Sequence, residues 1–96
     1  MPKALWIAHV NVLDAEKLAA YASAATPVIA AHGGVFLARG GAYEQLEGPD
    51  HTRNVVAQFP SLQAAHDCYH SEGYKAAIKL GEGGFQRSLM IVETIE

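Results

Sequence analysis

Residues 4–12 read ALWIAHVNV, and their pattern decides the fold class. Alternate side chains of an extended strand point to opposite faces. Apolar residues stand on both sides of this stretch: Trp6, Ala8, Val10 and Val12 on one side, and Leu5 and Ile7, followed by His9, on the other. Antiparallel strands usually leave one face in water, so apolar residues on both faces indicate that both are covered. We expect helices on one face and a partner subunit on the other.

The rest of the chain alternates between helical and extended spacing. The pattern predicts a helix over 14–32 that is kinked or divided at Pro27. A strand over 35–39 follows and resumes over 43–46 after a bend at Gly40-Gly41. The remaining elements are a strand over 53–59, a helix from 61, another helix over 72–80, and a strand over 89–95. With the first strand, this order is the βαββαβ of the ferredoxin-like motif. It predicts an α+β fold with a four-stranded antiparallel sheet, which would pair with a second copy as a dimeric α/β barrel.

Composition supports a small self-associating domain. The chain has 96 residues, half of them apolar and 18% charged, and we expect residues 1–96 to form a single domain. A domain of this size has little interior, so an interface between two copies would absorb the apolar excess. The homodimer is therefore the expected partner arrangement.

Charge and cysteine content exclude several classes of protein. The net charge is −3 and the basic residues are scattered, so we expect no nucleic-acid partner. Cys68 is the only cysteine, which rules out an intrachain disulfide and any CxxC site. The apolar stretch near the N-terminus is too short to span a bilayer and lacks a signal-cleavage pattern. We expect no membrane association and a cytoplasmic location.

A set of short motifs gives the chain a family resemblance. In order they are WIAHVNV at 6–12, GG at 33–34, RGG at 39–41, EG at 47–48, FPS at 59–61, AA at 64–65, YHS at 69–71 and Tyr74. Their order and spacing resemble the uncharacterised family called domain of unknown function thirteen-thirty, over nearly the whole chain. The resemblance implies a dimeric α/β barrel, a superfamily that includes cofactor-free monooxygenases, isomerases and dechlorinases. The chain departs from the family pattern at Gln58, Cys68 and Gly81, so a shared pocket would differ here in size and charge.

Arg39 is the leading candidate for binding a ligand. It ends a strand and precedes two glycines, whose backbone N–H groups a ligand can approach closely. A guanidinium at that position could hold a carboxylate or phosphate with two parallel hydrogen bonds. The alternative is a structural ion pair between Arg39 and Glu44 or Glu47.

His9 is the weak candidate for a catalytic residue. Its strand is otherwise apolar, so it is either a buried neutral imidazole with a hydrogen-bond partner or a general base inside the barrel.

The helical segment from residue 61 holds the remaining candidates. His66 and His70 share one side of a helix, a spacing that can bind a divalent metal, but no third ligand is evident and we expect no native metal. Tyr69 is either a core aromatic residue or, with His66, part of a pocket wall. Cys68 has no evident activating base, so we expect an inert thiol.

These observations leave two functions open. The first is a barrel protein that binds a small, partly apolar or anionic metabolite, or serves as a scaffold, without an assigned activity. The second is a cofactor-free monooxygenase- or isomerase-like enzyme, with His9 as base and Arg39 as anion holder. No cofactor motif is present, so we expect no cofactor in either case.

Overall fold

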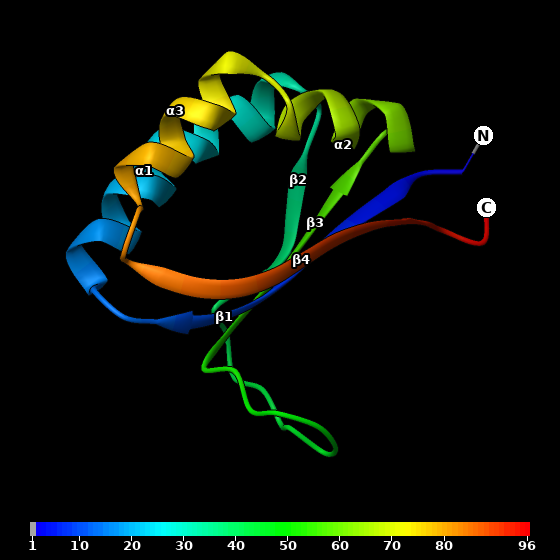
Figure 1. The fold of residues 1–96 in the computed structure, drawn as a ribbon. Helices are drawn as coiled ribbons and strands as arrows, with labels where there is room; N and C mark the ends of the chain where they lie inside the picture. The colour runs from blue at the N-terminus through cyan, green and yellow to red at the C-terminus, as the bar shows by residue number, and fades with distance from the viewer. Residues whose placement is uncertain (1) are drawn as a thin grey trace.

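The computed structural model describes residues 2–96 and contains one four-stranded sheet covered on one face by helices (Figure 1). The strands are β1 (Ala4–Val12), β2 (Val35–Arg39), β3 (Arg53–Phe59) and β4 (Phe85–Glu93), and the helices are α1 (Ala15–Ala31), α2 (Leu62–Tyr69) and α3 (Glu72–Leu80). The sheet order is β2-β3-β1-β4 with every neighbouring pair antiparallel. This is the predicted ferredoxin-like α+β fold.

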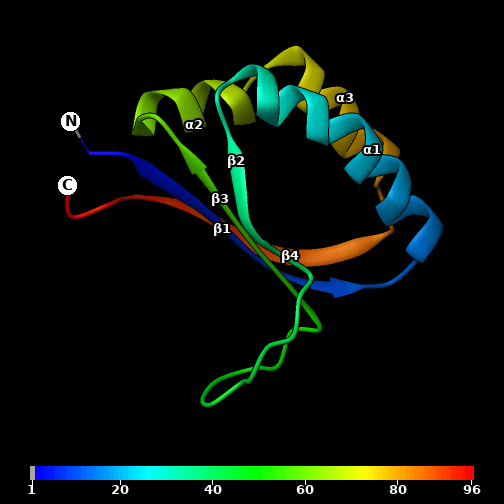
Figure 2. The same ribbon diagram turned by 180° about the vertical axis from the view of Figure 1, so that it is seen from behind.

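The layers explain the pattern of β1. Its even-numbered residues from Ala4 to Val10 face the helices and are almost fully buried, whereas Leu5, Ile7 and His9 face away from them. Figure 2 shows the same arrangement from behind, with no helix on the second face of the sheet. Within the described part of the chain, that face has no cover.

Helix α1 begins at a strong cap and runs through its proline. The Asp14 carboxylate accepts hydrogen bonds from the backbone N–H groups of Glu16 and Lys17. The prediction allowed a kinked helix or two abutting helices, and the structure has one helix from Ala15 to Ala31 with Pro27 inside it. The Thr26 hydroxyl donates to the Ala22 carbonyl in the turn that precedes the proline.

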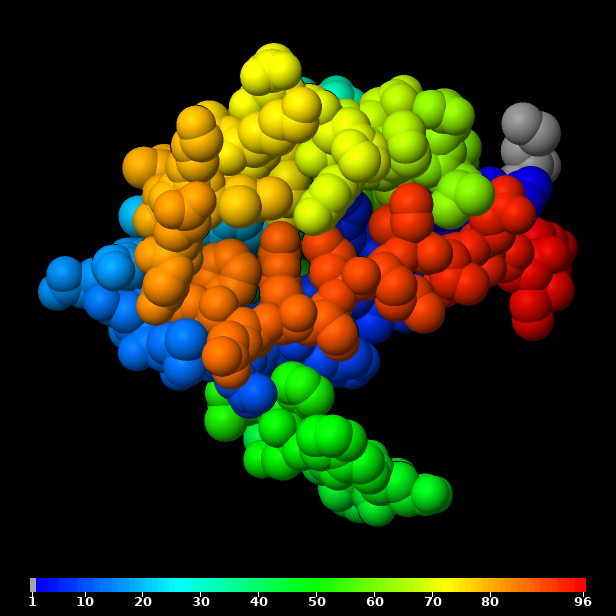
Figure 3. Space-filling view, viewed as in Figure 1, coloured from blue at the N-terminus to red at the C-terminus, as the bar shows by residue number. Residues whose placement is uncertain are grey.

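Two predicted strand boundaries are wrong. Residues 43–46 form no strand, because β2 ends where Gly40 adopts a φ of +71°, and residues 40–52 leave the sheet as a projecting loop (Figure 3). The last strand begins at Phe85, four residues before the predicted start at Leu89. Its pairing with β1 continues to Phe85 opposite Val12, although Gln86 and Ser88 interrupt the apolar pattern.

The centre of the core is Trp6, which is 2% exposed. Its ring lies 5.4 Å from that of Phe59, 6.0 Å from that of Tyr69 and 5.2 Å from that of Tyr74, measured between centroids. Trp6 therefore joins β1 to β3, α2 and α3. No helix within residues 2–96 has the length and apolar character needed to cross a membrane.

Gly34 provides a test of the packing between α1 and the sheet. A Cβ atom at Gly34 would lie 2.5 Å from Ile29 Cγ2 and 2.9 Å from Phe59 Cε2, whereas one at Gly41 would meet nothing within 4 Å. We predict that Gly34→Ala lowers the free energy of unfolding by about 1–3 kcal/mol in urea titrations, because the core must move to accept it. The control, Gly41→Ala, should change it by less than about 0.5 kcal/mol. Equal effects of the two substitutions would contradict the packing described here.

Candidate functional site

The pairing register places all three arginines of the chain on the helix-covered face of the sheet. Val10 is paired with Arg53 of β3 on one side and Arg87 of β4 on the other, so these two arginines share a row with an inward-facing residue. Arg39 is paired with Val55 of β3, one row along. Cross-strand partners point to the same face of a sheet. Three guanidinium groups therefore gather at one end of the same face.

These arginines line a cavity between the sheet and α1. Its enclosed space is about 50 Å³, within a hollow of about 520 Å³ that includes open solvent. Most of its walls are apolar or aromatic: Trp6, Ala8, Val10 and Val55 from β1 and β3, Leu18, Ala22, Ala25 and Ile29 from α1, and Phe36 and Phe85 from β2 and β4. Tyr21, Thr26 and the three arginines are the polar residues of the lining.

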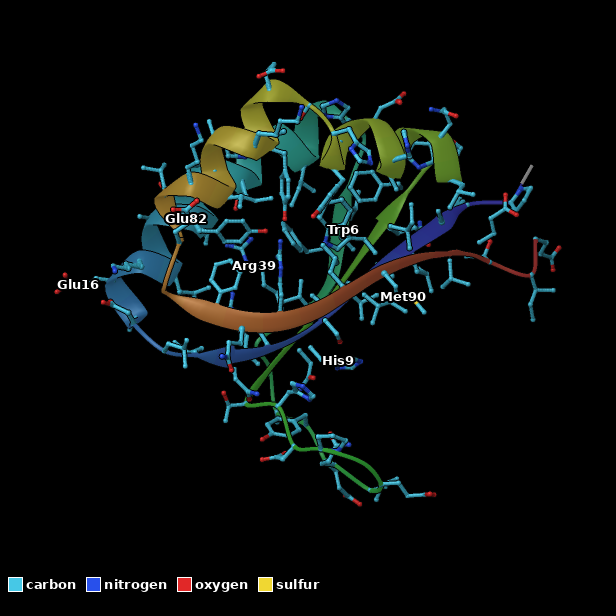
Figure 4. The ribbon with its side chains drawn as sticks, in the orientation of Figure 1. Trp6, His9, Glu16, Arg39, Glu82 and Met90 are labelled. Atoms are coloured by element: carbon cyan, nitrogen blue, oxygen red, sulfur yellow. The ribbon has the colours of Figure 1, made fainter. Side chains whose placement is uncertain are left out.

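The cavity is positively charged and has no acidic residue in its wall. Among residues 2–96 the ion pairs are His66 with Asp67 and Lys75 with Glu72, and neither involves an arginine. Arg39 therefore does not form the ion pair with Glu44 or Glu47 that was the alternative to ligand binding. Instead, the Arg39 guanidinium lies 4.5 Å from the centre of the Phe36 ring. Figure 4 shows Arg39 on the helix side of the sheet.

Tyr21 and Arg87 of the cavity wall form a hydrogen-bonded group with Tyr74, which lies behind them in the core. Arg87 Nη1 donates to the Tyr21 hydroxyl at 2.9 Å and Nη2 donates to the Tyr74 hydroxyl at 3.1 Å. The two hydroxyl groups are also hydrogen-bonded to each other. The Arg87 guanidinium stands 5.2 Å from the Tyr21 ring centre and 5.0 Å from that of Phe85. This network fixes a cation against the aromatic wall.

Burial and charge set the ionisation of this group. Burial raises the pKa of Tyr74 well above its ordinary value, so its hydroxyl keeps its proton. Burial acts to lower the pKa of Arg87, but the Tyr21 and Tyr74 hydroxyls outweigh it and the pKa is raised. Arg87 is therefore a permanent cation held by neutral oxygens.

Two other predicted site residues, His66 and Tyr69 of α2, lie in a second cavity. They line it with His70, which follows the helix, and with Leu89, Met90 and Ile91 of β4. Trp6 lines both cavities, so its indole stands between Arg39 and the α2 residues. The structure thus separates His66 and Tyr69 from Arg39 rather than bringing them into one site. Tyr69 is 39% exposed, and its ring packs against those of Trp6 and Tyr74 while the residue lines the second cavity, so it combines features of both alternatives.

The histidine pair of α2 has few partners for a metal. The rings of His66 and His70 lie 4.4 Å apart between centroids. In the described range, no group of three or more histidine, cysteine or acidic residues is close enough to hold an ion. The pair remains a two-ligand arrangement.

His9 is exposed, and the expectation that it is buried is wrong for the single subunit. It lies on the face of the sheet away from the helices, where Nδ1 is hydrogen-bonded to Asn54 Oδ1 at 2.7 Å (Figure 4). The reason is its odd position in β1, since the helices cover only the even side. His9 therefore lies outside the arginine-lined cavity.

Cys68 is fully buried against the core. Burial raises the pKa of its thiol to about 11, which disfavours the reactive thiolate at neutral pH. The position is suited to packing and not to nucleophilic chemistry.

The residues Arg53, Tyr21 and Arg87 line the cavity but were not among the predicted site residues, and only the first two had a usable signal in the sequence. Arg53 shares the parity of Val55, Ala57 and Phe59, which indicates the inner face. Tyr21 belongs to the apolar stripe of α1. Arg87 was hidden because the last strand was predicted to start after it.

The tyrosine pair gives a prediction for stability. Tyr21→Phe and Tyr74→Phe each break the same hydroxyl–hydroxyl bond and one bond from Arg87, so each should lower the free energy of unfolding by about 1–2 kcal/mol. Because they share one bond, the double variant should lose at least about 0.5 kcal/mol less than the sum of the single losses in urea titrations. Strict additivity would show that the two hydroxyl groups do not interact.

Solved structures with this architecture include proteins with and without a described activity. A protein of unknown function from Rhodopseudomonas palustris is 20% identical, with a TM-score of 0.81 over 99% of this chain and 84% of that one. SnoaB, a cofactor-independent oxygenase from Streptomyces nogalater, is 11% identical, with a TM-score of 0.70 over 100% and 96% of the chains. A dimeric ferredoxin-like protein of unknown function from Thermobifida fusca is 16% identical, with a TM-score of 0.64 over 97% and 92%.

At these identities the likeness establishes the fold and not the activity. No functionally curated protein is significantly similar to the chain. The sequence model of the domain of unknown function DUF1330 matches residues 3–95, which is nearly the whole chain. On that match, together with the ferredoxin-like fold, the chain belongs to the DUF1330 family.

Proposed function

We propose that residues 1–96 act as one domain of a homodimer that binds a small, partly apolar anion in the cavity between the sheet and α1. One observation carries the proposal: Arg39, Arg53 and Arg87 all line a largely apolar cavity that has no acidic residue in its wall. Guanidinium groups stay charged at any physiological pH. A ligand would supply the negative charge that this cavity lacks.

Energetics favour an anion over a neutral ligand. Arg39 is exposed and Arg53 half-buried in the single subunit, so both can reach a ligand, and hydrogen bonds to charged groups contribute about 1.5–3 kcal/mol each. Arg39 and Arg53 come from neighbouring strands, and Arg39 makes no ion pair within the described chain. A carboxylate entering the cavity would gain charge-assisted hydrogen bonds while displacing water from the arginines.

The cavity walls define the rest of the ligand. The cavity opens to solvent and its lining is mostly apolar, as in sites that bind small metabolites. The flat rings of Phe36, Phe85 and Tyr21 and the small side chains Ala8 and Ala22 leave space for an apolar or aromatic body. A monocarboxylate with a ring or a short branched chain matches these features.

The homodimer follows from the uncovered face of the sheet. Val56, Ile7 and Met90 are paired in one row across β3, β1 and β4 on that face, and Leu5 and Val92 are paired in the next row. Met90 is 54% exposed and Val92 42% exposed in the single subunit. Contiguous apolar patches of this kind mark interaction surfaces. The dimeric description of the Thermobifida fusca structure supports a second copy as the cover.

A cofactor-free monooxygenase- or isomerase-like enzyme is the second candidate. Tyr21 lines the cavity, and its hydroxyl could exchange a proton with a bound ligand. The structural likeness to SnoaB supports this candidate only through the shared fold. Consumption of dioxygen or conversion of a bound acid, followed by mass spectrometry, would favour the enzyme over simple binding.

A melting screen tests the anion site. We predict that aromatic or branched monocarboxylates at millimolar concentration raise the melting temperature of the wild-type protein. Arg39→Ala should weaken this binding by at least about tenfold, since it removes charge-assisted hydrogen bonds, and leave the melting temperature of the free protein nearly unchanged. Lys79→Ala, which removes an exposed charge on α3 outside the cavity, is the control and should bind as the wild type does. If no acid in the panel stabilises the wild type, the anion site is refuted.

A second prediction concerns assembly. Sedimentation at micromolar concentration should give twice the 10.2 kDa chain mass. Ile7→Glu should shift the protein to the monomer, because it places a charge in the middle of the apolar row, whereas Ala76→Glu on the exposed side of α3 should not. A wild-type protein that sediments as a stable monomer would contradict the homodimer.

A further inference from the structure

The protons of the Tyr21, Tyr74 and Arg87 network can be assigned from burial. Arg87 donates to both hydroxyl oxygens and accepts nothing, so two hydroxyl protons remain to be placed. One of them lies in the bond between the two hydroxyl groups, and that bond has two possible directions. The other proton needs an acceptor elsewhere.

Burial selects one direction. Tyr74 is 0% exposed, and its hydroxyl has hydrogen bonds only to Tyr21 and Arg87 within the described residues. If Tyr21 donated to Tyr74, the Tyr74 proton would be left in the core without an acceptor, which is costly. Tyr74 therefore donates to Tyr21. The Tyr21 oxygen then receives two hydrogen bonds, from Tyr74 and from Arg87.

The remaining proton is that of the Tyr21 hydroxyl, and an acceptor for it can come from the cavity. Tyr21 is only partly buried and lines the arginine-lined cavity. A hydroxyl group whose oxygen accepts two hydrogen bonds, one of them from a cation, donates its own proton more strongly. The network is thus a relay of hydrogen bonds from Arg87 and Tyr74 to Tyr21, and its last donor is the hydroxyl of Tyr21, a residue of the cavity wall.

We propose that the Tyr21 hydroxyl donates a hydrogen bond to a second oxygen of the ligand, so that the cavity selects carboxylic acids that also carry a carbonyl, hydroxyl or phenolic oxygen. This inference rests on the proposed anion site, because the carboxylate is taken to be the group held by Arg39 and Arg53. It goes beyond that site by naming the class of ligand, an aromatic or branched oxo- or hydroxy-acid.

The sheet register gives the spacing between the two polar ends of the cavity, at Arg53 and at Arg87. Arg53 and Arg87 lie on either side of Val10, so two strand spacings, about 10 Å at the backbone, separate them. Phe85 and the ring of Tyr21 lie at the Arg87 end, and Phe36 lies under Arg39. A ligand with oxygens at both ends of one ring suits this spacing better than a simple acid.

A pair of nearly isosteric acids tests the donor. The probes are 4-acetylbenzoate, whose ketone oxygen only accepts hydrogen bonds, and 4-isopropylbenzoate, which has a similar size and no such oxygen. Calorimetric titration gives the ratio of their affinities for the wild type, Tyr21→Phe, Tyr74→Phe and Tyr43→Phe. Tyr43 is a matched control, since its hydroxyl lies on the projecting loop beside Asp50.

The expected result is a loss of preference in one variant. Tyr21→Phe should lower the ratio of acetyl to isopropyl affinity by about tenfold. Tyr74→Phe should keep most of the preference, because Tyr21 retains its proton, and Tyr43→Phe should keep all of it. In the wild type, the ketone stretching band of bound 4-acetylbenzoate should move to lower frequency, which requires no variant to fold.

Failure of the inference and failure of the proposed function give different results. If both acids bind the wild type and Tyr21→Phe with the same ratio, the anion site stands and the donor role of Tyr21 is overturned. An equal loss in Tyr21→Phe and Tyr74→Phe would overturn the assigned direction of the relay. If neither acid binds the wild type, the anion site and the donor role both fail.

Discussion

The register of β1 against its two neighbours is the constraint on which the site depends. Because Val10 is paired with both Arg53 and Arg87, the side of β1 that carries Trp6 also carries the arginines. A slip of one residue in either pairing would turn an arginine to the opposite face of the sheet. Trp6 holds this register from the core, since its ring contacts those of Phe59 and Tyr74. Core packing and site geometry are therefore set by the same strand.

That register produces a cavity with an excess of positive charge. Its walls are apolar, and its charged groups are all cations. The neutral oxygens of Tyr21 and Tyr74 support Arg87 without cancelling its charge. A folded protein tolerates such an excess of one sign where solvent or a ligand supplies the opposite charge. The uncovered face of the sheet shows the complementary case. It is mostly apolar in the rows of Leu5 and Ile7, is polar but uncharged at Asn54 and Ser88 beside His9, and is suited to a second subunit.

The sequence predicted the fold well and the site only in part. Alternation in β1 and the element order were sufficient for the ferredoxin-like fold, because both depend on local periodicity. Arg39 was identified through its place at a strand end. The role of Arg87 depends on a pairing between residues distant in the chain, and polar Gln86 and Ser88 concealed the start of β4. His66 and Tyr69 share a helix face, but the separation of that face from Arg39 by Trp6 is a property of the tertiary structure alone.

A crystal structure with a brominated acid tests the central claim most directly, because anomalous scattering locates the bromine independently of the density for the protein. With 4-bromobenzoate, we predict a bromine peak between α1 and the sheet, with the carboxylate within hydrogen-bonding distance of Arg39 or Arg53. A bromine peak confined to another surface, with the arginines of the cavity paired to carboxylates of the projecting loop, would contradict it.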